Sequence, residues 1–316
     1  ELDQKKQVIL FQNRRGFSPV VECKTCGVSP QCPNCDVSLT FHKYKQELKC
    51  HYCNYQRAMP NSCGACGSNT LNTKGFGTEQ IELELKELFP DYTIGRMDLD
   101  TTRGKYGYQK IIGAFEAREI DILVGTQMLS KGLDFDNVSL VGILNADMML
   151  NFPDFRAHEK AFQVLTQVAG RSGRSGERGK VFLQTYQPDH PIIKNVINND
   201  YNKMYNNQLI ERKDYNYPPF VRLIRITLKD KSYEKLNSSS DWLNKVIRDN
   251  YSGIVLGPVY PEISRIKNKY HKEFLIKLRD LSELNNFRNI FQSILKSFDS
   301  ISKYRSVRIT VDVDPI

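Results

Sequence analysis

Apolar residues recur along the chain in short continuous runs, separated by stretches with helical periodicity. Near-uniform apolar runs of this length are typical of parallel strands buried on both faces, and the chain has them at Val8–Asn13, Ile120–Thr126, Ser139–Asp147 and Val181–Tyr186. A helical stripe follows Thr78, which we predict to accept hydrogen bonds from the free amides of the first turn. A second amphipathic helix is predicted over Arg156–Val168. Strands alternating with helices predict an α/β domain with a doubly wound parallel sheet.

The pattern changes after Tyr217-Pro218-Pro219. Strand-like runs at residues 222–230, 253–261, 271–280 and 306–314 enclose helical patterns that reach about residue 250 and cover residues 282–298. The order β-α-β-β-α-β predicts an α+β ferredoxin-like domain. We therefore divide the chain into an α/β domain of residues 1–22 and 68–216, an inserted segment of residues 23–67, and a C-terminal domain of residues 217–316.

Composition narrows the class of protein. The chain has 316 residues, 40% of them hydrophobic and 26% charged, which is ordinary for a globular protein with two or three domains. Its net charge of +9 favours a polyanionic partner, nucleic acid before membrane. No apolar run reaches the roughly 18 residues that a spanning helix needs. The start resembles no targeting peptide, lacks an initiator Met and enters a strand at once, so we expect the chain to be cut from a longer one.

All eight cysteines lie between Cys23 and Cys66, which indicates metal binding in a reducing cytoplasm and disfavours disulfides. They form four C-x-x-C pairs, and two such pairs complete one tetrahedral zinc site. We prefer a nested pairing, because the inner site then encloses a hairpin with a strand at residues 37–41. Sites closed by four sulfurs are structural, so His42 and His51 are expected to be surface residues. The expected sets are Cys23, Cys26, Cys63 and Cys66 for one zinc and Cys32, Cys35, Cys50 and Cys53 for the other.

Two further motifs suit phosphate chemistry. GTQMLSKGLDF follows the strand at residues 120–126, where α/β sheets bind ligands, although a plain polar turn is an alternative. In QVAGRSGR, a continued helix would place Gln167, Arg171 and Arg174 on one face, an arrangement suited to stabilising a transferring phosphoryl group.

The groups that grip ATP phosphates are missing from this sequence. It contains neither GxxxxGK[ST] nor a D-E-x-[HD] pair. Three D-x-D pairs are candidates for Mg²⁺, but acids at turns and strand ends are commoner.

The motifs NRRGF, GFGTEQ, RMDLDTT, GTQMLSKGLDF, LNAD, PDFRAHE, QVAGRSGR, LGP and DVDP, with the four cysteine pairs, occur in the order found in one helicase family. The chain resembles the PriA family of replication restart helicases, in helicase superfamily two. The resemblance implies a RecA-like second motor lobe, an inserted two-zinc ribbon and the C-terminal domain. It also implies an ATP-dependent 3′–5′ DNA helicase that recognises stalled or abandoned forks and restarts replication by primosome assembly. ATP and Mg²⁺ would be held by the absent first lobe.

The resemblance also assigns roles to residues. Gln167, Arg171 and Arg174 would be catalytic and face ATP, while Thr126, Lys131 and Gly132 would lie at DNA or between the lobes. Basic and aromatic residues expected to touch DNA are Arg14, Arg15, Lys267, Lys269 and Tyr270, although a solvated hairpin turn is an alternative for the last three.

Expected partners are forked and single-stranded DNA, single-stranded-DNA-binding protein, and primosome and helicase-loading proteins, with a monomeric, nucleoid-associated protein in the bacterial cytoplasm. The rival hypothesis is a zinc-ribbon adaptor that binds nucleic acid without catalysis. A zinc hydrolase or deaminase is excluded if every metal ligand is sulfur.

Overall fold

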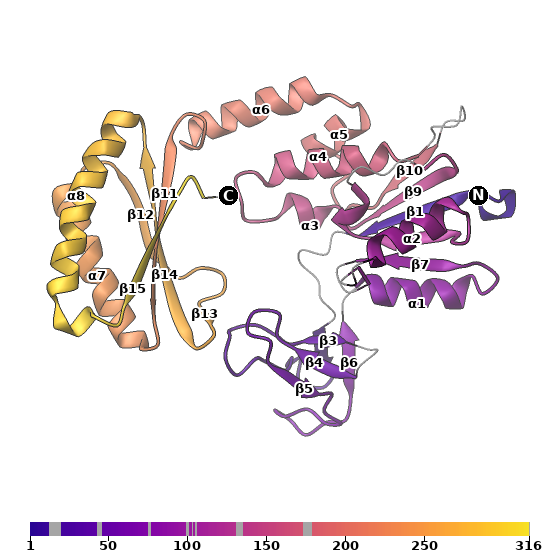
Figure 1. Ribbon diagram of the computed structural model, residues 1–316, viewed down its shortest axis with the longest axis horizontal. Helices are drawn as coiled ribbons and strands as arrows, with labels where there is room; N and C mark the ends of the chain where they lie inside the picture. The colour runs from indigo at the N-terminus through magenta and orange to yellow at the C-terminus, as the bar shows by residue number, and fades with distance from the viewer. Residues whose placement is uncertain are drawn as a thin grey trace. The chain divides into compact units, whose positions relative to one another are not determined.

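The protein is described by a computed structural model that covers residues 1–12, 20–42, 46–74, 77–98, 101–102, 104, 106–130, 135–172 and 179–315 (Figure 1). The chain forms two compact units, one of residues 1–19 and 74–209, the other of residues 20–73 and 210–316. The cysteine-rich segment therefore clusters with the C-terminal residues and not with the sheet that it interrupts in sequence. Among the described residues, no helix has the length and apolar character needed to cross a membrane.

The first unit is built on a five-stranded parallel sheet with the order β10-β9-β1-β8-β7. The first strand is central, and Val8 lies in register with both Ile122 and Leu140. The strands are β1 (Gln7–Gln12), β7 (Ile94–Met97), β8 (Ile122–Gly125), β9 (Val138–Leu144) and β10 (Lys180–Leu183). Its helices are α1 (Thr78–Leu88), α2 (Gly107–Glu116), α3 (Asp147–Leu150), α4 (Ala157–Ala169), α5 (Pro191–Ile197) and α6 (Tyr201–Asp214), the last of which continues into the second unit.

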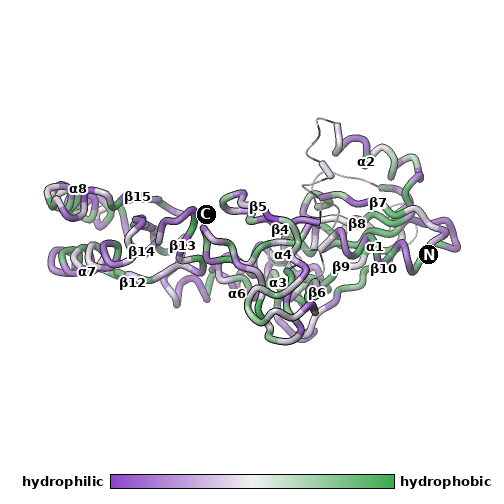
Figure 2. Tube along the Cα trace, turned by 90° about the horizontal axis from the view of Figure 1, so that it is seen from below, coloured by the Kyte–Doolittle hydropathy of each residue, from purple (hydrophilic) through white to green (hydrophobic). Residues whose placement is uncertain are grey.

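Both faces of this sheet are covered, which confirms the doubly wound arrangement. On one face Phe11 packs with Phe115 of α2 and Leu165 of α4. On the other, Val8 and Val124 of the sheet pack with Ile81 and Leu85 of α1. The alternation of these side chains explains why the strands are apolar almost throughout, as the hydropathy colouring of Figure 2 shows.

Two sequence predictions for this unit are wrong in detail. The N-cap of α1 is Gly77, and Thr78 instead donates its hydroxyl to Asp98 at 2.6 Å. The last strand was expected to be buried on both faces, but β10 is the edge of the sheet. Its Val181 and Phe182 are 40% and 62% exposed.

The C-terminal part of the second unit has the predicted ferredoxin-like order. Four antiparallel strands are arranged β12-β14-β11-β15, and α7 and α8 lie on the same face (Figure 1). Ile226 and Phe274 of the sheet share a core with Leu243 of α7 and Phe291 of α8. The elements are β11 (Arg222–Asp230), α7 (Tyr233–Asn250), β12 (Ile254–Val259), β13 (Arg265–Ile266), β14 (Lys269–Leu278), α8 (Leu281–Ser300) and β15 (Arg308–Val313).

The cysteine-rich segment forms a small sheet of its own with the order β5-β4-β3-β2-β6. Val21, Leu39 and Leu48 form its core together with thiols of the inner site. The predicted hairpin is present as β3 and β4, although the strand begins at Thr40 and not at Val37. The strands are β2 (Val20–Cys23), β3 (Thr40–His42), β4 (Glu47–Lys49), β5 (Gln56–Ala58) and β6 (Leu71–Lys74).

Candidate metal centres and nucleic-acid interface

The eight thiols gather in two groups of four, and within each group all sulfurs lie within 4.8 Å of one another. The nested pairing expected from the sequence is the one present. We call the sites outer and inner, and their members are Cys23, Cys26, Cys63 and Cys66 (outer) and Cys32, Cys35, Cys50 and Cys53 (inner).

The spacing of the sulfurs fits zinc. Sγ–Sγ distances are 3.6 Å for Cys23–Cys66 and 3.5 Å for Cys32–Cys53. A tetrahedron with Zn–S bonds of about 2.3 Å has edges of about 3.8 Å, whereas a disulfide is about 2.05 Å long. All four ligands at each site are sulfur, so no position remains for a catalytic water. The two sites are therefore suited to structural zinc, and neither is suited to zinc hydrolase or deaminase chemistry.

The carboxyl edge of the parallel sheet carries the GTQM turn. Thr126 directly follows β8, is almost buried, and donates its amide to the carbonyl of Met97 at 3.3 Å. Gly125 makes this turn possible, because a Cβ there would lie 2.5 Å from Leu129 Cδ1. The chain can then fold back over the strand end as the short 3-10 helix η3 (Gln127–Ser130). Lys131 and Gly132 lie outside the described residues.

A buried carboxylate, one of the D-x-D acids considered for Mg²⁺, organises the end of the neighbouring strand. Asp98 follows β7, is 0% exposed, and accepts hydrogen bonds from Thr78 Oγ1 at 2.6 Å and the Thr101 amide at 3.1 Å. Arg96 Nη1 lies 3.2 Å from the same carboxylate. These partners engage both carboxylate oxygens of Asp98, so its place in a D-x-D pair is explained by loop building. Thr102 then reaches Met128 of η3 at 3.5 Å, which connects the loop to the GTQM turn.

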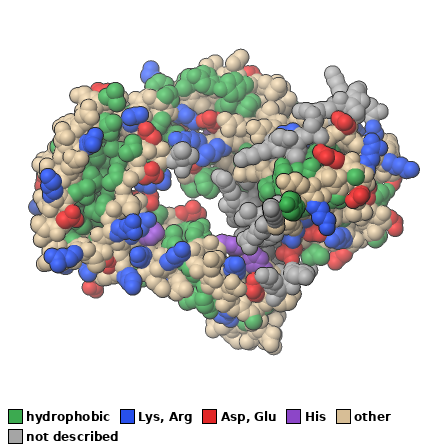
Figure 3. Space-filling model, in the orientation of Figure 1, with side chains coloured by type: hydrophobic (Ala, Val, Ile, Leu, Met, Phe, Trp, Pro, Cys, Tyr) green, Lys and Arg blue, Asp and Glu red, His purple; other side chains and the backbone are tan. Residues whose placement is uncertain are grey.

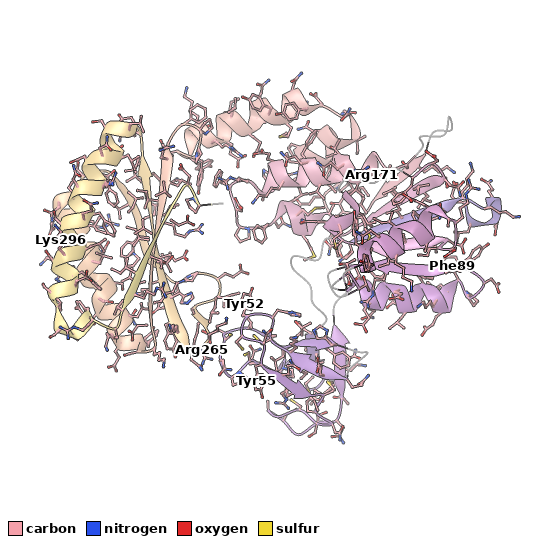
Figure 4. All side chains as sticks on the ribbon, viewed as in Figure 1. Tyr52, Tyr55, Phe89, Arg171, Arg265 and Lys296 are labelled. Carbon is pink, nitrogen blue, oxygen red and sulfur yellow. The ribbon has the colours of Figure 1, made fainter. Side chains whose placement is uncertain are left out.

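The arginine motif is placed differently from the prediction. Helix α4 ends at Ala169 with Gly170 as its C-cap, and Arg171 continues in a turn, donating its amide to the Val168 carbonyl at 3.1 Å (Figure 4). The continued helix is therefore wrong. Gln167 is exposed in the last turn of α4, and Arg171 is half-buried beyond it. Arg174 lies outside the described residues, as do Arg14 and Arg15.

The basic loop of the C-terminal domain is a tight hairpin between β13 and β14. Arg265 pairs with Tyr270 and Ile266 with Lys269 across it. The Lys267 and Lys269 side chains are exposed, whereas Tyr270 is half-buried with its ring 5.5 Å from Tyr233. The hairpin is not a free solvated turn, because it is hydrogen-bonded to the inner zinc site.

The described residues define a class: a doubly wound α/β domain in a chain with a two-site zinc ribbon. Family profiles match the chain as "Helicase conserved C-terminal domain" over residues 71–176, "PriA DNA helicase Cys-rich region (CRR) domain" over residues 32–57, and "Primosomal protein N C-terminal domain" over residues 213–316.

Curated relatives then point to one family. The chain is 39% identical over 312 residues to "Replication restart protein PriA" of Bacillus subtilis, covering 98% of this chain and 38% of that protein. The protein of the same name in Chlamydia pneumoniae is 38% identical over 319 residues, covering 100% and 42%. That of Haemophilus influenzae is 37% identical over 321 residues, covering 99% and 43%. The chain belongs to the PriA family and spans less than half the length of these relatives.

Proposed function

We propose that this chain is the C-terminal part of an ATP-dependent 3′–5′ DNA helicase that recognises stalled or abandoned replication forks and restarts replication by primosome assembly. The observation that carries the proposal is the match along nearly the whole chain to restart proteins, together with a helicase profile that spans both the GTQM turn and QVAGRSGR.

In the proposed mechanism, the residues of this chain act on ATP bound elsewhere in the complete protein. When bound, ATP would supply the phosphoryl group and Mg²⁺ would neutralise its charge, both held by other parts of the complete protein. Arg171 and Arg174, supported by Gln167, stabilise charge that develops on the transferring phosphoryl group. The half-buried position of Arg171 supports this role, because a side chain held by its surroundings loses little freedom when it meets a phosphate.

DNA would be bound by residues at the carboxyl edge of the sheet and, separately, by basic residues of the C-terminal domain. Thr126, Lys131 and Gly132 are proposed to lie at the DNA backbone or between lobes, and Arg14 and Arg15 are proposed to contact DNA. Lys267 and Lys269 are exposed on the hairpin, and Lys and Arg side chains are spread over the C-terminal domain in Figure 3. Single-stranded-DNA-binding protein and helicase-loading proteins are the proposed protein partners.

The test is DNA-stimulated ATP hydrolysis by the complete protein. Arg171→Ala and Arg174→Ala should each lower turnover by roughly 10³-fold or more, the range attributed to arginine fingers. Lys at either position should not restore it, because a point charge lacks the guanidinium fork. The matched control is Arg288→Ala, which changes an exposed arginine of α8. Near-normal turnover in both alanine variants would instead favour the non-catalytic adaptor.

A further inference from the structure

Three of the four cysteine knuckles are closed by the same backbone hydrogen bond. The residue after the second cysteine donates its amide to the carbonyl of the first, at 2.8 Å for Gly27, 2.9 Å for Asn54 and 2.8 Å for Gly67. All three have left-handed backbones, with φ of 72°, 64° and 74°. Glycine and asparagine are the residues that tolerate this conformation best, which explains their positions.

The knuckle of Cys32 and Cys35 is built differently. The residue after its second cysteine is Asp36, whose backbone is not left-handed. Its amide donates to the carbonyl of Arg265 at 2.9 Å. The C-terminal domain therefore receives the bond that the other knuckles make internally.

The sulfur of Cys35, in the same knuckle, also accepts a hydrogen bond from the C-terminal domain. Cys26 and Cys53 each take an amide hydrogen bond from the residue two positions later, Val28 and Tyr55. At Cys35 the corresponding donor is the amide of Lys267, at 3.3 Å from Sγ. An amide pointing at a thiolate sulfur stabilises the charge that a zinc ligand carries.

Side chains reinforce the same contact. Asp36 accepts from Arg265 Nε at 2.9 Å and from Ser264 Oγ at 2.7 Å, and Arg265 Nη1 donates to the Pro33 carbonyl at 3.0 Å (Figure 4). Asn268 donates its amide to the Asn34 carbonyl at 2.8 Å. The contact therefore involves every residue from Pro33 to Asp36.

An apolar residue completes the contact. Ile266, between the two basic residues of the hairpin, packs against the cluster that contains Val21, Leu39 and the inner thiols. Exposed ion pairs alone contribute little to stability. Here the ion pair is combined with backbone hydrogen bonds and a partly buried apolar side chain, which makes the contact specific.

We infer that the hairpin Ser264–Asn268 is the outer shell of the inner zinc site, so that this site is complete only when the C-terminal domain is docked on it. Zinc at the inner site and docking of the hairpin then stabilise each other by the same factor, as linked equilibria require. The outer site has no such dependence. This inference rests on the zinc sites and not on motor activity, so it stands or falls separately from the proposed function.

The first test is transfer of zinc from the complete, zinc-loaded protein to an excess of a chromogenic chelator. Arg265→Ala should weaken the hold on the inner zinc by about 10- to 100-fold, as loss of outer-shell partners does. Lys267→Pro should do the same, because it removes the donated amide and cannot adopt the left-handed backbone of Lys267 (φ 52°) that shapes the hairpin. The outer zinc should leave at its original rate. The two zincs are expected to be released in two kinetic phases. Cys63→Ser lacks the outer site, so the phase that it retains is release of the inner zinc. Lys269→Ala is the matched control, because its exposed side chain lies on the same hairpin.

A rescue variant separates this role from general damage. Asp36→Gly gives the knuckle the residue type of Gly27 and Gly67, so it should close on itself and slow zinc release again in the Arg265→Ala background. Equal release of the inner zinc from the original protein, Arg265→Ala and Lys267→Pro would overturn the inference.

The converse measurement uses trypsin. Cleavage at Arg265, Lys267 and Lys269 should accelerate about tenfold or more in Cys50→Ser, which loses the inner zinc, and not in Cys66→Ser, which loses the outer one. Equal cleavage in the two serine variants would also contradict the inference, even where an arginine variant fails to fold.

Discussion

Replacing Gly125 with alanine tests whether the GTQM turn depends on close packing at the strand end. An added Cβ would lie 2.5 Å from Leu129 Cδ1, 2.7 Å from Leu129 Cγ and 3.0 Å from the Met97 carbonyl oxygen. Relaxed contacts between such atoms are about 3.5–4.0 Å. Leu129 is 0% exposed, so its side chain has no empty space to enter.

The expected cost follows from two opposed effects. Overpacking of a buried site costs about 1–3 kcal/mol, and loss of a strand glycine returns about 0.5–1 kcal/mol. We therefore expect Gly125→Ala to destabilise the first unit by about 1–2 kcal/mol. The control is Gly113→Ala in α2, where a Cβ has nothing within 4 Å and should stabilise the helix by about 1 kcal/mol.

The assay is urea unfolding with a separate probe for each unit. Hydrogen exchange of the β8 amides reports on the first unit, and fluorescence of the single tryptophan, Trp242, reports on the C-terminal domain. We expect the stability reported by the β8 amides to fall in Gly125→Ala and to rise in Gly113→Ala, while the Trp242 transition stays unchanged. If Gly125→Ala left β8 as stable as before, the close contact with Leu129 would not govern this turn.

Four further outcomes are expected. Metal analysis should find two zinc ions held only by sulfur, and mass shifts from disulfides would contradict this. Cys32→Ser should lose one zinc and unfold the inner part of the ribbon while leaving the α/β sheet folded. Single-stranded DNA should bind weakly, with log affinity falling by about 0.7 per phosphate contact against log salt, and a salt-independent affinity would refute the basic interface. Lys277→Met removes the 2.6 Å hydrogen bond from Nζ to the Tyr215 carbonyl and the cation–π contact with Tyr217, whose ring centroid is 3.9 Å from Nζ. The free energy of unfolding reported by Trp242 should fall by about 1–3 kcal/mol, and an unchanged midpoint would contradict this. Burial, followed by the charge of His158, lowers the pKa of His190 against the opposing effect of Asp147, and His190 Nδ1 caps α5 by accepting from the Ile192 amide at 3.2 Å. This cap should contribute about 1 kcal/mol to the free energy of unfolding at pH values above the unfolded pKa of about 6.5. The contribution should disappear as the pH falls through the lower pKa of the folded state. His190→Asn should abolish this pH dependence when stability is measured at pH 7.5 and pH 5.

Much of the fold could be predicted because periodicity and burial coincide in it. The runs around Val8, Ile120 and Ser139 are central or next to the centre of the sheet, so both faces require apolar residues. The run at Val181 has the same composition but lies at the edge, and composition does not distinguish the two positions. The helix predicted past Ala169 was wrong because Gly170, a poor helix former, is its C-cap, whatever the spacing of the charged residues beyond it.

The zinc ligands could be predicted from local spacing alone, whereas the role of the basic hairpin could not. Arg265 and Asp36 are 229 residues apart, and no periodicity links them. One signal was available in the sequence: Asp36 occupies the position that Gly27, Asn54 and Gly67 take in the other knuckles. That departure from a repeated pattern indicated a knuckle with a different means of closure.

The long separation between the inner knuckle and its hairpin has a consequence for biosynthesis. A ribosome adding about 5–20 residues per second would need roughly 10–45 s to extend the nascent chain from Asp36 across the 229 positions to Arg265. During that interval the three self-closing knuckles can fold locally, but the fourth has no partner. The outer site should therefore acquire its metal while translation continues, and the inner site should mature only near the end of synthesis. Premature termination before residue 265 would leave a chain with one sound zinc site and one open to exchange.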